Sequence, residues 1–437
     1  MLKVIESFSG IGSQAQALEN IGVDFEVVAT MEWEIGAMYA YDILHNGPQD
    51  LTPYRHHNRD SLIETLSAYN LSNDGKKPLS YRALSSMNLQ QMKSILCAIE
   101  RNNNYVDITT VKGSQLPEAD VLTYSFPCQD LSISGHWHHN SGGIDRDANN
   151  RSTLLWEVER LLTEYVEIDK ELPSFLLMEN VSNILSSKHI DNFREWQRFL
   201  ENLGYVNQVY TLDARNFNVP QSRVRTYMIS VLAKNESVAR NVSQYFADNN
   251  LEKIKRDFSN IRPIKDYLRL NYSNEVYKRE AIQSTPIFTP SRQKIYEQNP
   301  ILATGLETKL GVWARTVTTK QDRNPNSGIV AYGSEKLVDF NHYYRNLTAR
   351  ECFLLMGFEE EKFDLLIENN FKVRANSDML NQNKLIQLAG NSIVVQVLEE
   401  VFSQINEIND KYLTAKDNLK IVQPKEVMIH KVANMKY

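Results

Sequence analysis

Five short apolar runs, separated by stretches with helical spacing, constrain the fold of this 437-residue chain more than any other feature. The runs are rich in β-branched or aromatic residues, and they cover residues 4–8, 27–31, 121–125, 175–178 and 227–232. Runs of this length are typical of buried strands. Their alternation with helices predicts an α/β fold built on a doubly wound, mostly parallel sheet.

Three helices can be placed from their caps and apolar faces. The first follows the opening strand, with Ser13 as its expected N-cap and Gly22 as its stop. A second covers about 191–204 and presents an apolar face at helical spacing. The last is expected to begin at the polar pair Asn391 and Ser392, ahead of another apolar helical pattern.

Residues 51–104 interrupt the alternation with a polar segment that is rich in Asn and Ser. It contains one fair helical pattern, over residues 87–100. We interpret this segment as an insertion within the first domain, and the sequence does not reveal its purpose.

A second, smaller and irregular domain is predicted for residues 234–384, which leaves residues 1–233 and 385–437 to the first domain. The window 251–350 holds 17 Lys+Arg and 10 Asp+Glu, a surplus of +7 in a chain whose net charge is -6. The overall acidity argues weakly against a nucleic-acid partner, but it conceals this local basic region.

The compartment follows from what the sequence lacks. No run of eighteen apolar residues is present, and the first residues lead into a strand pattern without a signal-peptide pattern. The three cysteines, Cys97, Cys128 and Cys352, are too few and too far apart for a disulfide framework or a four-thiolate zinc site. We expect a cytoplasmic protein without a membrane segment.

A glycine turn and an acid suggest a nucleotide-like ligand. Residues 8–12 join the first strand to its helix, and their glycines would let backbone approach a ligand. Glu32 ends the second strand, where an acid can accept hydrogen bonds from ribose hydroxyls, and Trp33 offers a flat face for a purine. The alternatives are an ordinary turn, an exposed acid and a half-buried tryptophan. The glycine spacing suits an adenosine without a pyrophosphate.

Cys128 lies at the next expected carboxyl edge, between Pro127 and Gln129 and directly after the strand that ends at Ser125. A thiolate is a strong nucleophile near neutral pH and suits reversible attack on an electron-poor ring carbon. The alternative is a buried, inert cysteine. The polar, glycine-containing stretch 130–152 that follows favours a loop that closes over a substrate.

Three charged side chains are candidates for the same edge of the sheet. Glu179 ends the fourth run, where a carboxyl with a raised pKa could donate to a ring nitrogen; its alternative is a helix cap. Arg223 and Arg225 precede the fifth run and suit a carbonyl oxygen or phosphates; their alternative is a solvated surface. The histidines at 136, 138 and 139 lack a fourth ligand nearby, so we expect no metal site.

In this order, these motifs resemble those of the DNA cytosine-5 methyltransferases of the bacterial restriction-modification type, over nearly the whole chain. The resemblance extends to residues 151–154 after the catalytic loop, 345–358 as a ninth motif and 390–392 as a tenth. The run 123–132 is especially similar to a bacterial and mollicute branch that includes CpG-methylating members.

The resemblance implies a Rossmann-like methyltransferase fold with a catalytic first domain and a target-recognition second domain. It implies S-adenosylmethionine as cofactor, a flipped-out cytosine in duplex DNA as substrate, and a covalent adduct with Cys128. The implied catalytic residues are Cys128, Glu179, Arg223 and Arg225. The implied cofactor residues are Phe8, Ser9, Gly10, Ile11, Gly12, Glu32, Trp33, Asp107, Ile108, Pro127, Leu154, Asn391 and Ser392. The implied DNA contacts are Gln129, Ser132, Ser134, Arg315, Thr316 and Thr318, and no metal is implied.

Further expectations are a monomer in the bacterial nucleoid or encoded by a phage, with a cognate restriction endonuclease as a possible partner. Asp107 is the least firmly assigned residue because the insertion lengthens the stretch before it. The rival functions are a cytosine-5 methyltransferase for RNA, a non-catalytic DNA-binding module and, less fitting, a nicotinamide dehydrogenase. The recognition sequence stays open.

Overall fold

The computed structural model describes most of the chain. The described residues are 1–127, 131, 143–146, 151–255, 257, 261–287, 289–309, 311–323, 326–332 and 344–414. The predicted residues Cys128, Gln129, Ser132 and Ser134, together with the histidines at 136, 138 and 139, lie outside these ranges.

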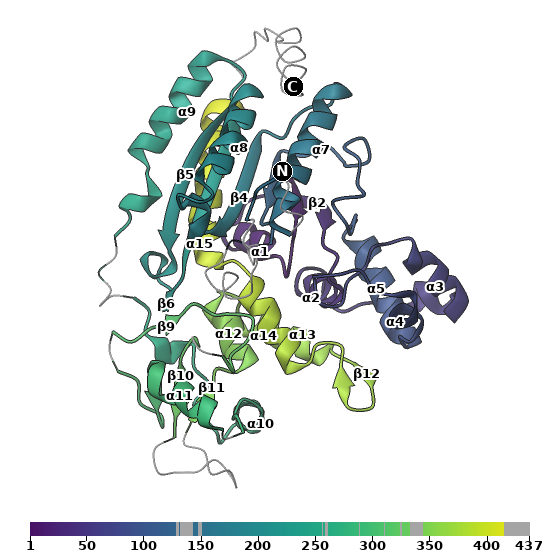
Figure 1. Cartoon of the computed structure of the whole chain (residues 1–437), viewed down its shortest axis with the longest axis vertical. Helices are drawn as coiled ribbons and strands as arrows, with labels where there is room; N and C mark the ends of the chain where they lie inside the picture. Colours follow the sequence, from purple (N-terminus) through teal and green to yellow (C-terminus); the bar gives the residue numbers. More distant parts are fainter. Residues whose placement is uncertain are drawn as a thin grey trace.

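A six-stranded sheet forms the centre of the upper part of the molecule (Figure 1). Its strands run in the order β2-β1-β3-β4-β7-β5. They are β1 (Leu2–Ser7), β2 (Phe25–Met31), β3 (Val121–Tyr124), β4 (Phe175–Val181), β5 (Tyr205–Asp213) and β7 (Val224–Leu232). Strands β1 to β4 pair in parallel, and β7 is antiparallel to both of its neighbours. The predicted doubly wound sheet is confirmed, and β5 is a strand that the sequence pattern did not indicate.

Helices cover both faces of this sheet. On one face, α7 (Leu155–Glu167) and α8 (Ile190–Asn202) pack on alternate strand residues that include Ile5, Leu122 and Met178. On the other face, α1 (Ser13–Asn20), α2 (Ile35–Asn46) and α15 (Val395–Ile408) pack on residues that include Val4, Val121 and Leu177. Because both faces are buried, the strands read as continuous apolar runs.

The start of α1 differs from the prediction. Gly12, with φ of 76°, occupies the N-cap position, and Ser13 is already the first helical residue. The Ser13 hydroxyl instead shares a hydrogen bond of 2.5 Å with the hydroxyl of Ser392, far along the chain. Ser13 therefore joins two distant segments rather than capping its own helix.

The insertion is a small helical unit packed on the end of α2, visible on the right of Figure 1. It consists of η1 (Thr52–His56), α3 (Arg59–Ser67), α4 (Tyr81–Ser85) and α5 (Leu89–Arg101). The helix predicted over 87–100 is confirmed as α5, which buries Met92, Ile95 and Ile99. The insertion thus shares the core of the first domain.

The less regular region lies below the sheet in Figure 1. It contains α10 (Glu275–Gln283), α11 (Pro290–Gln298) and a three-stranded sheet of β8 (Ile301–Thr304), β10 (Ile329–Ala331) and β11 (Tyr344–Asn346). Single-turn helices η5 (Leu251–Lys253) and η7 (Ile264–Asp266) precede them. The helix α9 (Glu236–Asp248) falls within the range 234–384 predicted for the second domain. It nevertheless packs against β5 of the central sheet and buries Val238 and Val242.

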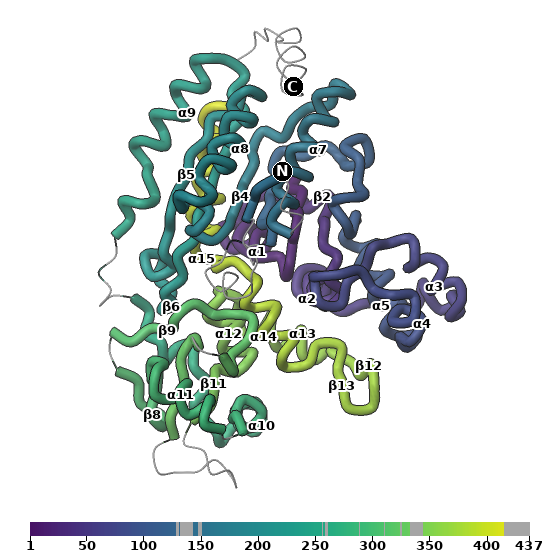
Figure 2. The backbone as a smooth tube through the Cα atoms, viewed as in Figure 1, coloured from purple at the N-terminus to yellow at the C-terminus, as the bar shows by residue number. Residues whose placement is uncertain are grey.

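The chain then returns from the lower region to the sheet (Figure 2). It passes through α12 (Ala349–Leu355), α13 (Glu360–Glu368), the hairpin of β12 (Lys372–Arg374) and β13 (Ser377–Asp378), and α14 (Gln382–Asn391). The final helix, α15, lies beside α1 and continues into η8 (Asn409–Leu413).

The predicted cap of the last helix is wrong in detail. Asn391 ends α14, Ser392 is the C-cap of that helix, and α15 begins only after Val394. The stretch Gln382–Leu413 is long and apolar enough to cross a membrane, but 67% of its most apolar window is buried inside the protein. It therefore packs as part of the core.

Candidate functional site

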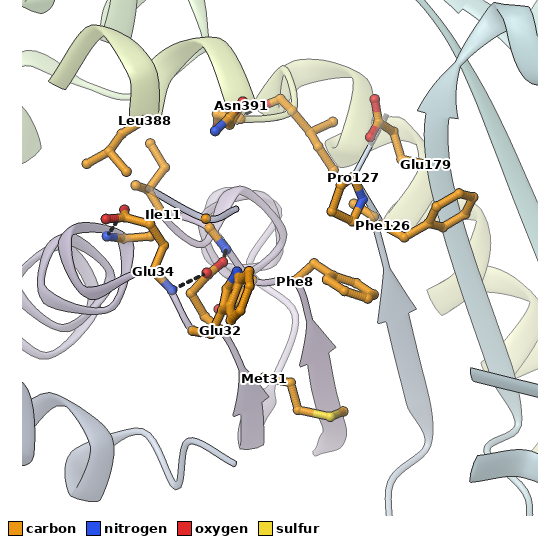
Figure 3. Close-up of a pocket in the computed structure, with 18 of the residues that line it drawn as sticks. Phe8, Ile11, Met31, Glu32, Glu34, Phe126, Pro127, Glu179, Leu388 and Asn391 are labelled. Atoms are coloured by element: carbon orange, nitrogen blue, oxygen red, sulfur yellow. Dashed lines mark hydrogen bonds between the residues drawn. The ribbon is translucent and has the colours of Figure 1, made fainter. Parts of the chain in front are cut away.

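A cavity of about 400 Å³ opens at the carboxyl ends of β1 to β4, where ligands bind in doubly wound sheets. Twelve of the thirteen predicted cofactor residues line it; the exception is Gly12. Glu179, Arg223 and Arg225 line the same cavity. Figure 3 shows Glu32 and Ile11 on one side of it and Phe126, Pro127 and Glu179 on the other.

The turn between β1 and α1 forms the floor of this cavity. Phe8 has a φ of 58° and Gly10 a φ of 57°, a left-handed backbone that costs energy at a residue other than glycine. The Phe8 amide donates to the carbonyl of Met31 at 2.7 Å, which fixes the turn against the end of β2. Strain of this kind gathers at ligand sites, and this turn adjoins the cavity.

Gly12 makes a close packing contact with α2, and its part in cofactor binding stays a prediction. A Cβ at this position would collide with the rings of His45 and Tyr41 in α2. The same His45 ring lies 3.0 Å from the carbonyl of Ile11. Gly12 therefore allows α2 to pack closely under the turn, and it does not line the cavity.

Glu32 is held at the end of β2 by backbone donors. Its Oε2 accepts a hydrogen bond from the amide of Gly10 at 3.0 Å, and its Oε1 accepts one from the amide of Glu34 at 2.8 Å (Figure 3). Burial raises the pKa of Glu32 to about 7, and the nearby charge of Glu34 adds to the rise while these amides oppose it. The carboxyl is thus fixed in place, and a further hydrogen-bond donor that enters the cavity would lower its pKa.

Asp107 reaches the cavity despite the long insertion before it, next to Ile108. Its Oδ1 accepts from the amide and hydroxyl of Thr109 at 2.9 and 2.8 Å. Its Oδ2 accepts from the side-chain amide of Asn70, in the insertion, at 2.8 Å. The structure therefore brings this least firmly assigned residue to the cavity that Trp33 also lines.

The backbone on both sides of the nucleophile candidate is pinned by side chains. Asn180 donates from Nδ2 to the carbonyl of Phe126 at 3.0 Å, and the buried Ser152 donates to the carbonyl of Pro127 at 2.9 Å. Beyond the candidate, Asn183 donates to the carbonyl of Leu131 at 2.6 Å. These hydrogen bonds fix where the chain enters and leaves the stretch that contains residue 128.

The other two cysteines, Cys97 and Cys352, are buried free thiols. Burial raises the pKa of each, so neither presents a reactive thiolate. Among the residues that the structure describes, no cluster of three or more His, Cys, Asp or Glu side chains could hold a metal ion.

Glu179 and Arg225 form a pair inside the cavity. The Arg225 Nε lies 3.4 Å from Oε1 of Glu179, and both side chains are largely buried. Burial raises the pKa of Glu179, while the charges of Arg225 and Arg223 act against that rise. A buried carboxyl with a raised pKa can hold a proton and donate it, as predicted for this position.

Arg223 is placed differently from Arg225, although the sequence treats them alike. Its terminal nitrogens donate to the carbonyls of Val317 at 2.8 Å, Ser392 at 2.7 Å and Gly390 at 3.2 Å. A guanidinium engaged by three carbonyls holds backbone together. These hydrogen bonds give Arg223 a structural role at the cavity, and its catalytic role stays a prediction.

Arg223 belongs to a seam between the sheet domain and the lower region, where β6 (Gln221–Ser222) pairs in parallel with β9 (Ala314–Arg315). Gln221 accepts a hydrogen bond from the amide of Val317 at 2.9 Å. Gly390 lies so close to the segment that follows β9 that a Cβ there would overlap the backbone of Thr318 and Thr319. We call residues 314–319 with their partners at 221–223 and 390 the seam.

The three predicted DNA contacts within the seam engage the protein itself. Arg315 donates to Asn299 at 3.0 Å and to the carbonyl of Gln298 at 3.2 Å. The hydroxyls of Thr316 and Thr318 donate to the backbone carbonyls of Ser222 and Lys320, each at 2.8 Å. Their contact with DNA stays a prediction.

Part of the positive charge in the window 251–350 is neutralised inside the protein. Arg345 and Glu351 form a fully buried bidentate pair with two contacts of 2.7 Å. Arg350 pairs with Glu280, Glu360 and Asp364, and Arg269 pairs with Glu360. The basic surface of the lower region is therefore smaller than the count of +7 suggested.

Several residues that line the cavity escaped the prediction. They are found at the start of α2, in the insertion, at the start of η2 (Arg151–Leu154) and along α14, and they include Glu34, Asp74, Gly75, Arg151, Gln387 and Leu388. Asn73-Asp74-Gly75 is a recognisable turn pattern. No local signal, however, places that turn beside Trp33.

Comparisons with known proteins agree with one another. A family model described as C-5 cytosine-specific DNA methylase matches residues 78–407. The chain is 32% identical to the orphan methyltransferase M.SssI of Spiroplasma monobiae, covering 92% of this chain and 97% of that protein. It is 30% identical to the type II methyltransferase M2.ScrFI of Lactococcus lactis subsp. cremoris, covering 93% and 99%.

A solved structure supports the fold. The crystal structure of the S. pombe Dnmt2 methyltransferase superposes with a TM-score of 0.58 at 19% identity, covering 93% of this chain and 99% of that one. At that identity the likeness concerns the fold alone.

Proposed function

Because this chain belongs to the C-5 cytosine-specific DNA methylase family and is a DNA cytosine methyltransferase, we propose that it methylates carbon 5 of a flipped-out cytosine in a specific duplex DNA sequence. S-adenosylmethionine, when bound, supplies the methyl group. The observation that carries the proposal is the meeting of Glu32, Glu179 and Arg225 in one cavity that opens beside Pro127, the neighbour of Cys128.

The residues around the cavity fit an adenosine-bearing cofactor. The Glu32 carboxylate, already fixed by two amides, would accept hydrogen bonds from the ribose hydroxyls. Trp33 and Ile108 would contact the adenine, with Asp107 at its edge. The turn at residues 8–11 and the α14 end at Asn391 and Ser392 would enclose the rest of the molecule.

The chemistry requires a nucleophile because carbon 5 of cytosine is itself a poor one. The Cys128 thiolate would add to carbon 6, forming a sulfur–carbon bond and pushing electron density to carbon 5. Glu179 would donate its proton to N3 as this charge develops, and Arg225 would bind the O2 oxygen. Once carbon 5 carries the methyl group, its proton would pass to solvent and Cys128 would leave as a thiolate, while N3 returns its proton to Glu179; the ring is then restored.

The base cannot react while stacked in a duplex, so it would have to be flipped into the cavity. Gln129, Ser132 and Ser134, just after the nucleophile in the sequence, are proposed to contact the DNA beside it. Arg315, Thr316 and Thr318 are proposed to act from the seam.

Substitution of the nucleophile tests the mechanism. We expect Cys128→Ser to abolish methyl transfer and retain DNA binding, because a hydroxyl without a base beside it is a weak nucleophile. The native protein should form a denaturation-resistant adduct with DNA containing 5-fluorocytosine, and the variant should not. Cys97→Ser is the matched control, since Cys97 is a buried thiol that does not line the cavity.

The substrate class and the target can be read in one experiment. The protein is expressed in a methylation-free host, and methylated cytosines are located by single-base sequencing of the genomic DNA. Nearly complete methylation of one short motif would support a sequence-specific enzyme, and a CpG inside it would match the branch resemblance. Scattered or absent methylation of the genomic DNA would exclude the proposal of a sequence-specific enzyme. Equal activity on transfer RNA and duplex DNA, in a separate assay, would favour the RNA alternative.

We propose that the enzyme acts as a monomer in the cytoplasm of a bacterium, on bacterial or phage DNA. The relatives named above include one described as type II and one described as orphan. A cognate endonuclease that cuts the same site is therefore proposed as a possible partner, and co-purification or a neighbouring gene with matching cleavage would test it.

A further inference from the structure

The insertion sends one segment, residues 70–78, to the cavity at the end of β2. Asp74 and Gly75 of this segment line the cavity directly. Its neighbours contact three separate parts of the cavity wall: the end of β2, the residues around Asp107, and α14.

The first contact joins the segment to the end of β2. The Ser72 amide donates to the carbonyl of Trp33 at 2.7 Å, and the Ser72 carbonyl accepts from the amide of Ile35 at 2.9 Å. Ser72 and Glu34 thereby form an isolated parallel bridge. The segment extends the edge of the sheet at the tryptophan proposed to contact the adenine.

The second contact joins the segment to Asp107, another residue that lines the cavity. Asn70 donates from Nδ2 to Oδ2 of Asp107 at 2.8 Å. Ser72 and Asn70 therefore hydrogen-bond to two residues, Trp33 and Asp107, that both line the cavity.

The third contact reaches α14. The Lys384 ammonium donates to the carbonyl of Asn73 at 2.8 Å and to Oε1 of Glu34 at 2.9 Å. Lys384 thus fastens the segment and the start of α2 to the helix that carries Gln387 and Leu388 into the cavity. Arg151 adds a hydrogen bond of 3.2 Å to the carbonyl of Gly75.

The shape of the segment depends on the Ser72 hydroxyl. This side chain is fully buried, and its hydroxyl donates to the carbonyl of Lys77 at 2.7 Å while accepting from the amide of Gly75 at 3.0 Å. Gly75 has a φ of 68°, which the turn needs. Ser72 therefore closes the turn that presents Asp74 and Gly75 to the cavity.

We propose that residues 70–78 of the insertion form a wall of the cofactor site, and that Ser72 is the positioning residue that holds this wall in place. The inference rests on the proposed function and assigns the insertion a task in cofactor binding. A segment that only decorated the surface would not line the cavity between Trp33 and α14.

The test measures cofactor affinity and kinetics with the full chain. Ser72→Ala should weaken the binding of S-adenosylhomocysteine by roughly threefold to tenfold, because the turn loses two hydrogen bonds. The KM for S-adenosylmethionine should rise similarly, while kcat at saturation and the affinity for DNA stay unchanged. Ser80→Ala, which removes the N-cap of α4 in the same insertion and lines no part of the cavity, is the matched control.

Two further measurements guard against a variant that simply loses stability. Asn70→Ala changes an exposed side chain and should also weaken S-adenosylhomocysteine binding without lowering the unfolding temperature by more than Ser80→Ala does. Hydrogen exchange on the native protein should show protection of residues 70–78, and not of α4, when S-adenosylhomocysteine is added.

The possible results separate the two proposals. Native protein that does not bind S-adenosylhomocysteine would remove the proposed function, and this inference with it. Native protein that binds it, with unchanged affinity in Ser72→Ala and Asn70→Ala and no protection of residues 70–78, would overturn the inference alone.

Discussion

The Arg223 guanidinium donates a hydrogen bond of 2.8 Å to the carbonyl of Val317, and so ties the edge of the catalytic sheet to the lower region. The amide of the same Val317 donates to Gln221 at 2.9 Å, so one peptide segment is held from both sides. Arg225, two residues on, pairs instead with Glu179 inside the cavity. Neighbouring arginines of one motif thus make different contacts, Arg223 in the seam and Arg225 with Glu179 in the cavity.

This division predicts that substitution of Arg223 mainly lowers stability, whereas substitution of Arg225 mainly lowers kcat. Arg223→Ala should lower the free energy of unfolding by about 2–4 kcal/mol, because three carbonyls lose a buried charged donor. Arg225→Ala should change stability little and lower kcat by about 100-fold, because a cation that stabilises the developing charge is lost. Thermal unfolding and single-turnover kinetics measure the two effects, and a pair of variants that behave alike would contradict the assignment.

Trp33→Ala should weaken cofactor binding by about 1–3 kcal/mol, the usual magnitude for loss of an aromatic stacking surface. Trp33→Phe should recover part of it, because a smaller aromatic face remains. Calorimetric titration with S-adenosylhomocysteine measures both. Trp313→Ala removes a tryptophan that does not line the cavity and should leave the affinity unchanged. Equal affinity in all of these variants would return Trp33 to a packing role.

Cofactor affinity should rise with pH around neutrality because burial raises the pKa of Glu32 to about 7. Ribose hydroxyls donate to the charged carboxylate, so binding must first remove its proton at lower pH. The dissociation constant of S-adenosylhomocysteine should therefore fall between pH 6 and pH 8 for the native protein. Glu32→Gln should bind more weakly and show a flat profile over that range.

In the protein without cofactor, the Glu32 carboxyl should make the free energy of unfolding fall as the pH rises. Its folded pKa lies above its ordinary value of 4.5, so its contribution to stability is present below that pH and is lost as the pH rises through about 7. Glu6, whose pKa burial raises to about 8, acts in the same direction. The difference in unfolding temperature between the native protein and Glu32→Gln isolates the Glu32 part, and a difference independent of pH would contradict the prediction.

Glu351→Gln should lower the free energy of unfolding by about 3–5 kcal/mol, because it leaves the fully buried Arg345 without its counter-charge. Glu351 also completes a capping box with Thr348 at the start of α12 and accepts from the amide of Arg269. Glu361→Gln, on the exposed surface of α13, is the matched control. Denaturant unfolding measures both, and equal stabilities would show that the pair contributes nothing.

The sheet could be predicted from the sequence because most of its strands are buried on both faces. The strand β5 escaped because its residues Asn207, Gln208 and Thr211 are polar and only partly buried or exposed. An edge strand needs few apolar residues, so no apolar run marked it.

The residues of the site could be predicted where a motif places them at the end of a strand, as for Glu32 and Glu179. Contacts made across the chain left no local pattern. Ser13 looks like a helix cap, yet its hydroxyl bonds to Ser392. In the sequence, Arg223 looks like a second active-site cation. Its hydrogen bond to Val317 forms only in the folded chain and leaves no local pattern. The insertion gave no sign that it would reach Trp33.

The close contact at Gly390 bears on how such an enzyme can change its target during evolution. If the lower region reads the DNA sequence, as the resemblance implies, a recombination event that exchanges it must retain a backbone at residues 318–319 that fits against this glycine. Crossovers that leave the native residues 314–319 in place keep Gln221, Arg223 and Gly390 in contact with the segment that fits them. Crossovers within those six residues join mismatched surfaces, so new specificities should be inherited in blocks that flank the seam.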